Sequence, residues 1–343
     1  MTRGKPFEIG GTVVAPGTRA IIDLPIARLY THDSLKMPVQ VVNGKQAGPT
    51  LFISAAVHGD EINGVEIIRR LLSLKHLARL RGTLLAVPVV NVHGFLDHNR
   101  YLPDRRDLNR SFPGSPKGSV AGRLAHKFLN EIVLRSDCGI DLHTGALHRE
   151  NLPQIRATLD NGETTRLALA FGAPVILDAQ VRPGSLRSCA IKNGIPMLIY
   201  EAGEALRFNE VCIKAGIRGI LHVMRKLGML KSGSVRIARV EPIIAESSRW
   251  VRAPISGVVR AVVELGQRIT KGQRLAVVSD PLGDTQEYVL ATHSGIVIGR
   301  TNLPLALEGD ALFNVATFDR VSDTEEAVEE FTANHDPNFT SGT

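Results

Sequence analysis

The sequence of 343 residues has few cysteines, few aromatic residues and no long apolar run. Its cysteines, Cys138, Cys189 and Cys212, are odd in number, far apart and without Cys-X-X-Cys spacing. This pattern argues against a disulfide framework and a thiolate zinc site, and it is typical of a reducing cytoplasm. No window approaches the roughly 18 apolar residues of a membrane span, and the opening MTRGKPFEIGG lacks the apolar segment of a secretory signal. We therefore expect a cytoplasmic protein with no membrane partner.

Aromatic residues make up 5% of the chain, and no run of lysine and arginine with interleaved aromatic residues occurs. We therefore expect no nucleic-acid partner, because surfaces that bind single strands need such residues. The charge is divided unevenly: 31 basic and 19 acidic residues precede Val235, whereas 10 basic and 15 acidic residues lie from Val235 onwards. A basic first part suits an anionic ligand, although solubility alone also explains it.

Short apolar runs alternate with amphipathic stretches over residues 49–233. Runs such as 50–57 and 196–200 are typical of buried strands, and apolar residues at helical spacing indicate helices over 60–74 and 209–227. This alternation predicts an α/β domain with a mixed, mostly parallel sheet covered by helices. We expect it to be the catalytic domain because the motifs described below lie within it. Residues 1–48 are expected to form a β segment that joins the domains.

The pattern changes after about residue 234, where short β-type runs broken by glycine follow one another. Residues 253–259 resemble residues 291–297, which lie 38 positions later. This internal repeat predicts an all-β, barrel-sandwich-like domain over residues 234–320. The acidic and polar tail, 321–343, is expected to be partly disordered.

The motif His58-Gly59-Asp60-Glu61 directly follows the expected strand 50–57, and His58 is the only histidine with a glutamate three residues on. At a strand-to-helix turn both side chains can converge at the sheet edge where open α/β sheets bind ligands. An imidazole and a carboxylate suit Zn²⁺. Taken alone, the motif is better explained by structure: Glu61 would interact with the dipole of the following helix, and His58 would merely pack.

A second motif, Asp141-Leu142-His143, ends another expected strand. The period of two places Asp141 and His143 on the same face of that strand. His143 could complete a site of two histidines and one glutamate, and Asp141 could be structural or could brace the site. Two motifs at strand ends that complete one ligand set are more specific than either motif alone.

The loop that follows the strand 83–90 is crowded with arginines, at positions 100, 105, 106 and 110. Arginine suits bidentate binding of a carboxylate, and near a metal it can polarise a carbonyl oxygen. A solvated loop is the alternative. Farther on, the apolar strand 196–200 ends in Glu201, which could take a proton from water beside a metal or could simply face solvent, and Glu204 competes for that role.

In this order the motifs HGDE (58–61), Asn91 with Arg100, DLNR (107–110), DLH (141–143) and YEAGE (200–204) resemble the aspartoacylase/succinylglutamate desuccinylase family, in its predicted-deacylase branch. That family belongs to the zinc carboxypeptidase-like (M14) superfamily. The resemblance covers about residues 48–230 and extends to a C-terminal β domain. It implies one Zn²⁺ per chain and hydrolysis of the amide bond of small N-acyl amino acids or related N-acyl amines.

The resemblance also implies roles for individual residues. His58, Glu61 and His143 would bind Zn²⁺, Glu201 would act as general base and then general acid, and Arg100 would polarise the scissile carbonyl. Contacts with a small N-acylated carboxylate substrate are expected from Asn91, Asn109, Arg110 and Arg187. Asp107 and Asp141 would contact the metal ligands and fix their orientation without binding the metal themselves.

Several alternatives remain open at this point. A metallocarboxypeptidase acting on short peptides, or a non-catalytic protein that binds small carboxylates, would use similar residues. The C-terminal β domain could flank the cleft or could serve stability and contacts in a homo-oligomer. A swinging-arm role is rejected because the stretch between the two repeats, 281–288, has no lysine.

Overall fold

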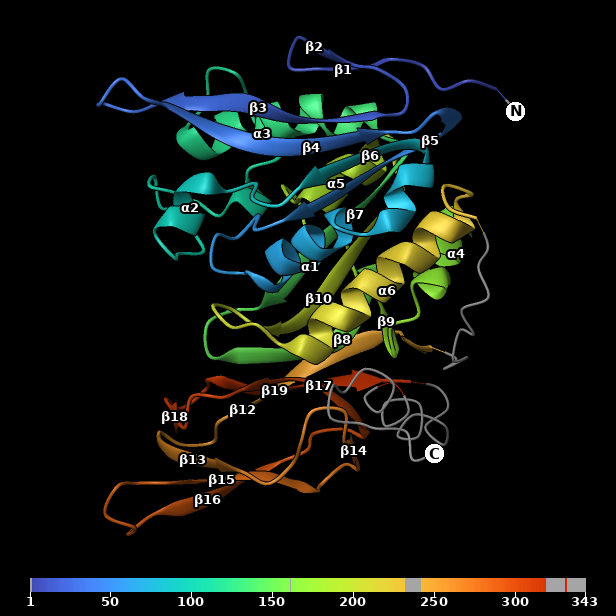
Figure 1. Ribbon diagram of the computed structural model, residues 1–343. Helices are drawn as coiled ribbons and strands as arrows, with labels where there is room; N and C mark the ends of the chain where they lie inside the picture. Colours follow the sequence, from blue (N-terminus) through green and yellow to red (C-terminus); the bar gives the residue numbers. More distant parts are fainter. Residues whose placement is uncertain (1, 161, 232–241, 319–330, 332–343) are drawn as a thin grey trace.

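A mixed β-sheet with helices on both faces forms the centre of the molecule (Figure 1), as seen in a computed structural model that describes residues 2–160, 162–231, 242–318 and 331. Its central strands run parallel, and they are β5 (Gln46–Ala55), β6 (Arg81–Val87), β7 (Cys138–Gly145) and β10 (Met197–Glu204). The carboxyl ends of these strands therefore meet at one edge of the sheet, where ligands bind in such folds.

Two groups of helices cover the two faces of this sheet (Figure 1). One face is covered by α1 (Asn63–Leu72), α4 (Gly162–Phe171) and α6 (Glu210–Lys226), and the other by α3 (Val120–Glu131) and α5 (Leu186–Lys192). The short helix α2 (Val92–Leu96) follows β6, and short 3-10 helices lie at Lys75–Arg79, Leu108–Arg110 and Val133–Arg135. Every residue of β7 is buried, because helices pack on both of its faces.

Close packing of α3 on the sheet depends on a glycine in β7. A Cβ atom at Gly139 would lie 2.0 Å from the ring of Phe52, which packs edge-on against Phe128 of α3 at 6.2 Å between ring centroids. The missing side chain therefore makes room for an aromatic pair that joins the sheet to its helix layer.

Antiparallel strands extend the sheet in both directions. Beyond β10 lie β8 (Arg149–Ala157), β17 (Gly295–Thr301), β19 (Ala311–Thr317) and β12 (Ser247–Arg252), while β9 (Val175–Asp178) and β11 (Ile243–Ala245) pair beside β8. Beyond β6 lie β4 (Ser34–Asn43) and β3 (Thr18–Arg28), with the hairpin β1 (Phe7–Ile9) and β2 (Thr12–Val14) nearby. The C-terminal domain is thus joined to the catalytic domain by continuous strand pairing between β8 and β17.

The N-terminal strands lie at the end of the sheet opposite the C-terminal domain (Figure 1). They were expected to join the two domains, but β4 pairs with β6 and buries Met37, Val39 and Val41 in the catalytic core. Residues of this segment therefore extend the catalytic sheet and do not connect it to the C-terminal domain.

A second, four-stranded sheet completes the C-terminal domain. Its strands are β16 (Gln286–Leu290), β15 (Arg274–Ser279), β13 (Gly257–Ala261) and β18 (Leu305–Ala306). The repeat found in the sequence reappears as reciprocal pairing: Gly257 of β13 pairs with β18, and Gly295 of β17 pairs with β14 (Arg268–Ile269). The expected acidic tail lies outside the described residues, apart from Phe331, which is buried in the core of the catalytic domain.

None of the helices in the described ranges combines the length and the hydrophobicity that a bilayer crossing needs. All three cysteines are free and buried. Burial raises the pKa of the Cys138 and Cys212 thiols to about 12, and it also raises the pKa of Cys189.

The raised pKa values predict thiols that do not react in the folded protein. At pH 8 a thiol reagent such as DTNB should modify none of the three native cysteines within minutes and all three after denaturation, because the thiolate is the nucleophile. The shifts also predict that the free energy of unfolding falls as the pH rises from about 9 toward 12, since these thiols ionise earlier in the unfolded chain. Fast labelling of native protein would contradict this prediction.

Candidate metal centre and active site

Three side chains that are far apart in the sequence meet at the carboxyl edge of the sheet. Nδ1 of His58 lies 2.7 Å from Oε1 of Glu61, and Nδ1 of His143 lies 2.7 Å from Oε2 of the same carboxylate. All three residues are at least 96% buried, and their ligand atoms lie within 4.8 Å of one another. Two imidazole nitrogens and a carboxylate form a donor set that suits a divalent metal ion.

The loop that carries His58 is held close to the backbone of α2. A Cβ atom at Gly59 would lie 1.9 Å from the carbonyl carbon of Gly94, so only glycine fits between the two segments. Ala56, just after β5, has a φ of 49°, a value that non-glycine residues seldom adopt. The backbone therefore turns sharply at this point and brings His58 and Glu61 to the same side.

Each histidine is braced by a carboxylate on its other ring nitrogen. Nε2 of His58 lies 3.1 Å from Oδ1 of Asp107, and Nε2 of His143 lies 2.7 Å from Oδ2 of Asp141. The other oxygen of Asp141, Oδ1, accepts a hydrogen bond from the hydroxyl of Ser54. The ring orientation is thereby fixed with both Nδ1 atoms directed at Glu61. The structure places Asp107 and Asp141 where the sequence predicts bracing carboxylates.

The charges of this cluster are arranged to hold a cation. Burial lowers the pKa of His58, but Glu61 and Asp107 outweigh burial and raise it, and Asp141 and Glu61 raise the pKa of His143 well above its ordinary value. Burial would raise the pKa of Glu61, yet the two imidazoles bring it far below its usual range. A divalent cation held by both Nδ1 atoms would take the place of two imidazolium protons, so the residues fit a metal ion.

Arg100 lies beside the cluster. Its guanidinium group contacts Oε1 of Glu61 at 3.0 Å and Oδ2 of Asp107 at 3.1 Å, and its side chain is 26% exposed. Although burial lowers the pKa of Arg100, the two carboxylates raise it above its ordinary value, so the group stays charged. A positive charge therefore faces the cavity next to the candidate metal ligands.

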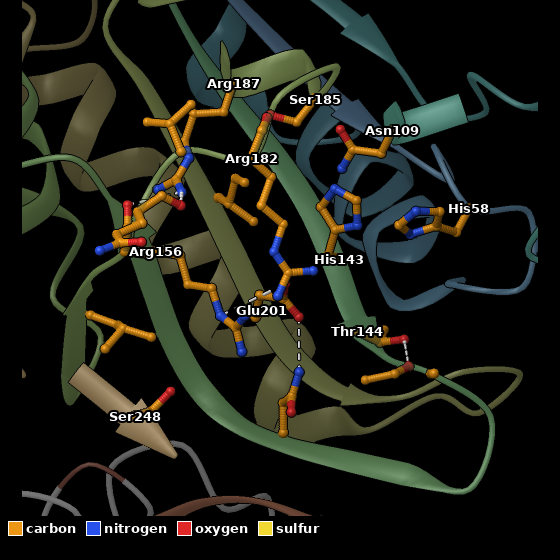
Figure 2. Close-up of a pocket in the computed structure, with 18 of the residues that line it drawn as sticks. His58, Asn109, His143, Thr144, Arg156, Arg182, Ser185, Arg187, Glu201 and Ser248 are labelled. Carbon is orange, nitrogen blue, oxygen red and sulfur yellow. Dashed lines mark hydrogen bonds and ion pairs between the residues drawn. The ribbon is translucent and has the colours of Figure 1, made fainter. Parts of the chain in front are cut away.

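The cluster opens into a cavity of about 740 Å³. In Figure 2, Glu201 of β10 lies near Arg156 and Arg182, and His143 and His58 lie to the right of these residues. Six arginines line the cavity, at positions 100, 110, 149, 156, 182 and 187. The wall is completed by the C-terminal domain through Ser248 and Trp250 of β12, and Arg149 stacks over the Trp250 ring at 5.1 Å.

Glu201 lines the cavity and Glu204 does not. Oε2 of Glu201 accepts a hydrogen bond of 2.8 Å from Asn151, and its Oε1 lies 3.9 Å from Nε of Arg156. The carboxylate of Glu204 instead accepts hydrogen bonds from the backbone of His148 and the side chain of Asn302. Of the two glutamates considered from the sequence, only Glu201 is placed to act on a bound molecule.

The expected substrate contacts divide into two groups. Asn109, Arg110 and Arg187 line the cavity. The side chain of Asn109 accepts a hydrogen bond from the backbone of Leu186, and Arg110 is exposed beside it. Asn91 is fully buried and does not line the cavity; its side chain caps α2 and donates to the backbone of Arg100 at 3.4 Å. The expectation that Asn91 contacts substrate is therefore not met, because its polar atoms serve the backbone.

Arg187 is 95% buried and holds the loop that borders the cavity. Its Nη2 donates to the backbone carbonyls of Ala179 and Gln180, and its Nη1 has no hydrogen-bond partner among the described residues. Burial and the nearby charge of Arg156 lower the pKa of Arg187 to about 10. The sequence missed Asn151, Arg156, Arg182 and Trp250, which belong to no local motif. Asn151 and Arg156 lie on β8 next to β10, Arg182 lies between β9 and α5, and Trp250 lies on β12, farther along the same sheet.

Residues 47–227 match the sequence model of the succinylglutamate desuccinylase/aspartoacylase catalytic domain. The chain belongs to this family. N-alpha-acetyl-L-2,4-diaminobutyric acid deacetylase of Halomonas elongata is 34% identical over 180 residues, which are 50% of this chain and 52% of that protein. The match thus spans about half the length of this curated relative.

Solved structures of other proteins have a similar fold. The succinylglutamate desuccinylase/aspartoacylase of Rhodobacter sphaeroides has a TM-score of 0.78 at 26% identity, covering 88% of this chain and 96% of that one. The product-bound ectoine utilization protein EutE (DoeB) of Ruegeria pomeroyi has a TM-score of 0.78 at 25% identity, covering 88% and 95%. These similarities confirm the expected family and the expected α/β fold with added C-terminal β-sheets.

The bracing of His143 leads to a prediction about metal affinity. Asp141→Asn should weaken metal binding about 10- to 100-fold, because the amide no longer fixes the ring and its charge as the carboxylate does. Competition with a chromophoric chelator for Zn²⁺ measures this change. Asp23→Asn, which alters only an exposed ion pair with Lys36, is the matched control. Equal affinities for both variants would show that Asp141 does not support the site.

Proposed function

We propose that this protein is a zinc-dependent deacylase that hydrolyses the amide bond of small N-acylated amino acids or related N-acyl amines. The observation that carries the proposal is the buried cluster of His58, Glu61 and His143 with Glu201 on the wall of the same cavity. Membership in a family named for an acylase and a desuccinylase supports it, as does the deacetylase from Halomonas elongata.

Zinc is the metal we propose, since catalytic zinc typically takes three protein ligands of the histidine and glutamate type. The ligands would be His58, Glu61 and His143. When bound, zinc supplies a Lewis acid that lowers the pKa of water and polarises a carbonyl oxygen. The bracing by Asp107 and Asp141 suits such a site because it keeps both Nδ1 atoms available.

Proton transfer is the role we assign to Glu201. Its carboxylate accepts a proton from the attacking water as the oxygen of that water bonds to the acyl carbon. The same proton then passes to the nitrogen of the amine as the C–N bond breaks. The products are a carboxylic acid and a free amine.

Charge stabilisation is the role we assign to Arg100, whose guanidinium group faces the cavity beside Glu61. It would balance the negative charge that grows on the carbonyl oxygen during attack. To Arg110 and Asn109, which line the cavity, we assign the binding of a substrate carboxylate, and the arginine-rich wall favours anionic substrates in general.

Substrate size is limited by the wall that Ser248 and Trp250 contribute from the C-terminal domain. A cavity of about 740 Å³ suits a small molecule, which favours N-acyl amino acids over the peptides of a metallocarboxypeptidase. A cytoplasmic location and a homo-oligomeric state remain predictions from the sequence.

Substitution of the proposed base tests the mechanism. Glu201→Gln should keep its zinc and lose about 10²- to 10⁴-fold in kcat, because the amide cannot accept the proton. The assay uses a panel of N-acetyl, N-succinyl and N-formyl amino acids, including N-α-acetyl-L-2,4-diaminobutyrate, together with short peptides. Glu204→Gln is the matched control and should stay within a few-fold of the parent.

Other outcomes of this assay would contradict the proposal. A Glu201→Gln variant with parental kcat would remove Glu201 from the reaction. Faster turnover of the peptides than of the N-acyl amino acids would support a carboxypeptidase. Parent protein that binds these molecules but turns over none of them with zinc bound would support a non-catalytic carboxylate-binding protein.

Recognition of the substrate carboxylate gives a separate prediction. Arg110→Ala should raise KM about 10- to 100-fold with little change in kcat, because a charge-assisted hydrogen bond to an unreacting group is lost. Arg106→Ala is the control, since Arg106 is exposed in the same loop and does not line the cavity. An unchanged KM in the Arg110 variant would place the carboxylate elsewhere.

A further inference from the structure

We propose that Asn151 is a positioning residue for Glu201 and that the C-terminal domain supports it through Gly299. This inference rests on the proposed function, because it assumes that the carboxylate of Glu201 carries out proton transfer. It assigns to the C-terminal domain a role in the geometry of the active site that is separate from forming the cavity wall.

The contact between the two side chains is direct and partly buried. Asn151 is 93% buried, and its Nδ2 donates a hydrogen bond of 2.8 Å to Oε2 of Glu201. Among the described residues no hydrogen bond reaches Oε1, whose nearest cation is Nε of Arg156 at 3.9 Å. One oxygen of the carboxylate is thus fixed while the other stays available.

The chemistry of an amide suits this task. A neutral N–H donor orients a carboxylate without adding a full positive charge, so the carboxylate remains able to accept a proton. An arginine in direct hydrogen-bond contact would hold Glu201 equally well but would favour its ionised form more strongly. Asn151 therefore restricts the orientation of Glu201 without placing a full positive charge in hydrogen-bond contact with it.

Strand register brings the two residues together. β8 and β10 pair in an antiparallel manner, with Gln154 opposite Glu201 and Asn151 opposite Gly203. The register shifts between Glu201 and Gly203, and Gly203 has a φ of 78°. This irregularity allows the side chain of Asn151 to reach the carboxylate although the two residues are not direct partners.

On its other side Asn151 pairs with Gly299 of β17, which belongs to the C-terminal domain. A Cβ atom at Gly299 would lie 3.0 Å from Oδ1 of Asn151 and 3.4 Å from Cβ of Asn314. The backbone of Gly299 does not adopt a left-handed conformation, so the need for glycine here comes from space. The amide of Asn151 occupies the room that a side chain at 299 would take.

The experiment compares Asn151→Ala in two backgrounds. In the parent, this substitution should lower kcat about 10- to 100-fold with KM within twofold and with zinc content unchanged. In the Glu201→Gln background it should change kcat less than twofold, because the base that Asn151 orients is already absent. The substrate is the panel member with the highest kcat/KM for the parent protein.

Asn43→Ala is the matched control. Asn43 is a buried strand asparagine that donates to the backbone of Lys5 and Val14, far along the sheet from the cavity. Its replacement should lower the unfolding temperature without changing kcat. A loss of kcat in the Asn151 variant that Asn43→Ala does not reproduce therefore cannot come from reduced stability alone.

Gly299→Ala tests the contribution of the C-terminal domain. It should lower kcat about 3- to 10-fold in the parent and cause no further loss together with Asn151→Ala, because the smaller side chain at 151 leaves room for the new methyl group. Parental kcat in this variant would refute the support by Gly299.

The remaining outcomes separate this inference from the proposed function. Parental kcat in Asn151→Ala, with Glu201→Gln impaired, would refute the positioning role alone. A raised KM with unchanged kcat would make Asn151 a substrate contact, and equal losses in both backgrounds would make its role independent of Glu201; either result overturns the inference. Parental kcat in Glu201→Gln would instead refute the proposed function itself.

Discussion

The buried carboxylate of Glu61 is the constraint on which the rest of the site depends. An ionised group with 2% exposure is costly unless charges and donors surround it. Here His58, His143 and Arg100 supply the charge, and the backbone N–H of Thr144 donates a further hydrogen bond at 3.2 Å. These partners come from three segments at the carboxyl edge of the sheet: the loop after β5, the arginine-rich loop and β7. Folding must bring all of them to one point, or the carboxylate is left buried without compensation.

That requirement is met by close packing of the sheet and its loops around the site. The loop after β5 is pressed against α2 at Gly59, and β7 is buried along its whole length. The bracing carboxylates Asp107 and Asp141 arise from the arginine-rich loop and from β7, so they also link these segments. The same elements that satisfy Glu61 therefore set the shape of the cavity in front of it.

The candidate metal ligands could be predicted from the sequence because each motif sits at the end of a parallel strand. Parallel strands bring such ends together without any knowledge of the loops, which is why His58, Glu61 and His143 were found. The helix α4 was not predicted, whereas the helices expected over 60–74 and 209–227 are observed as α1 and α6. The placement of Asn91 failed because its spacing from Arg100 says nothing about which way its side chain points.

The cavity residues that lie on antiparallel strands could not be predicted from the sequence. Asn151 and Trp250 reach the cavity only because β8 lies between β10 and β17, and because β12 follows in the same sheet. Pairing between segments some 150 residues apart leaves no local pattern in the chain. The strand pairing that joins the two domains, and the residues that it brings to the site, are therefore seen only in the structure.

The continuity of the sheet through β8 and β17 has a consequence for how this protein can be divided. Cutting the chain before the C-terminal domain would remove the strand that pairs with Arg149–Asn151 of β8 and leave backbone N–H and C=O groups of this stretch without a partner strand. Such edges recruit strands from other molecules and promote aggregation. The C-terminal domain therefore supports the solubility of the α/β domain and also forms part of the cavity wall. We regard the two domains as one folding unit.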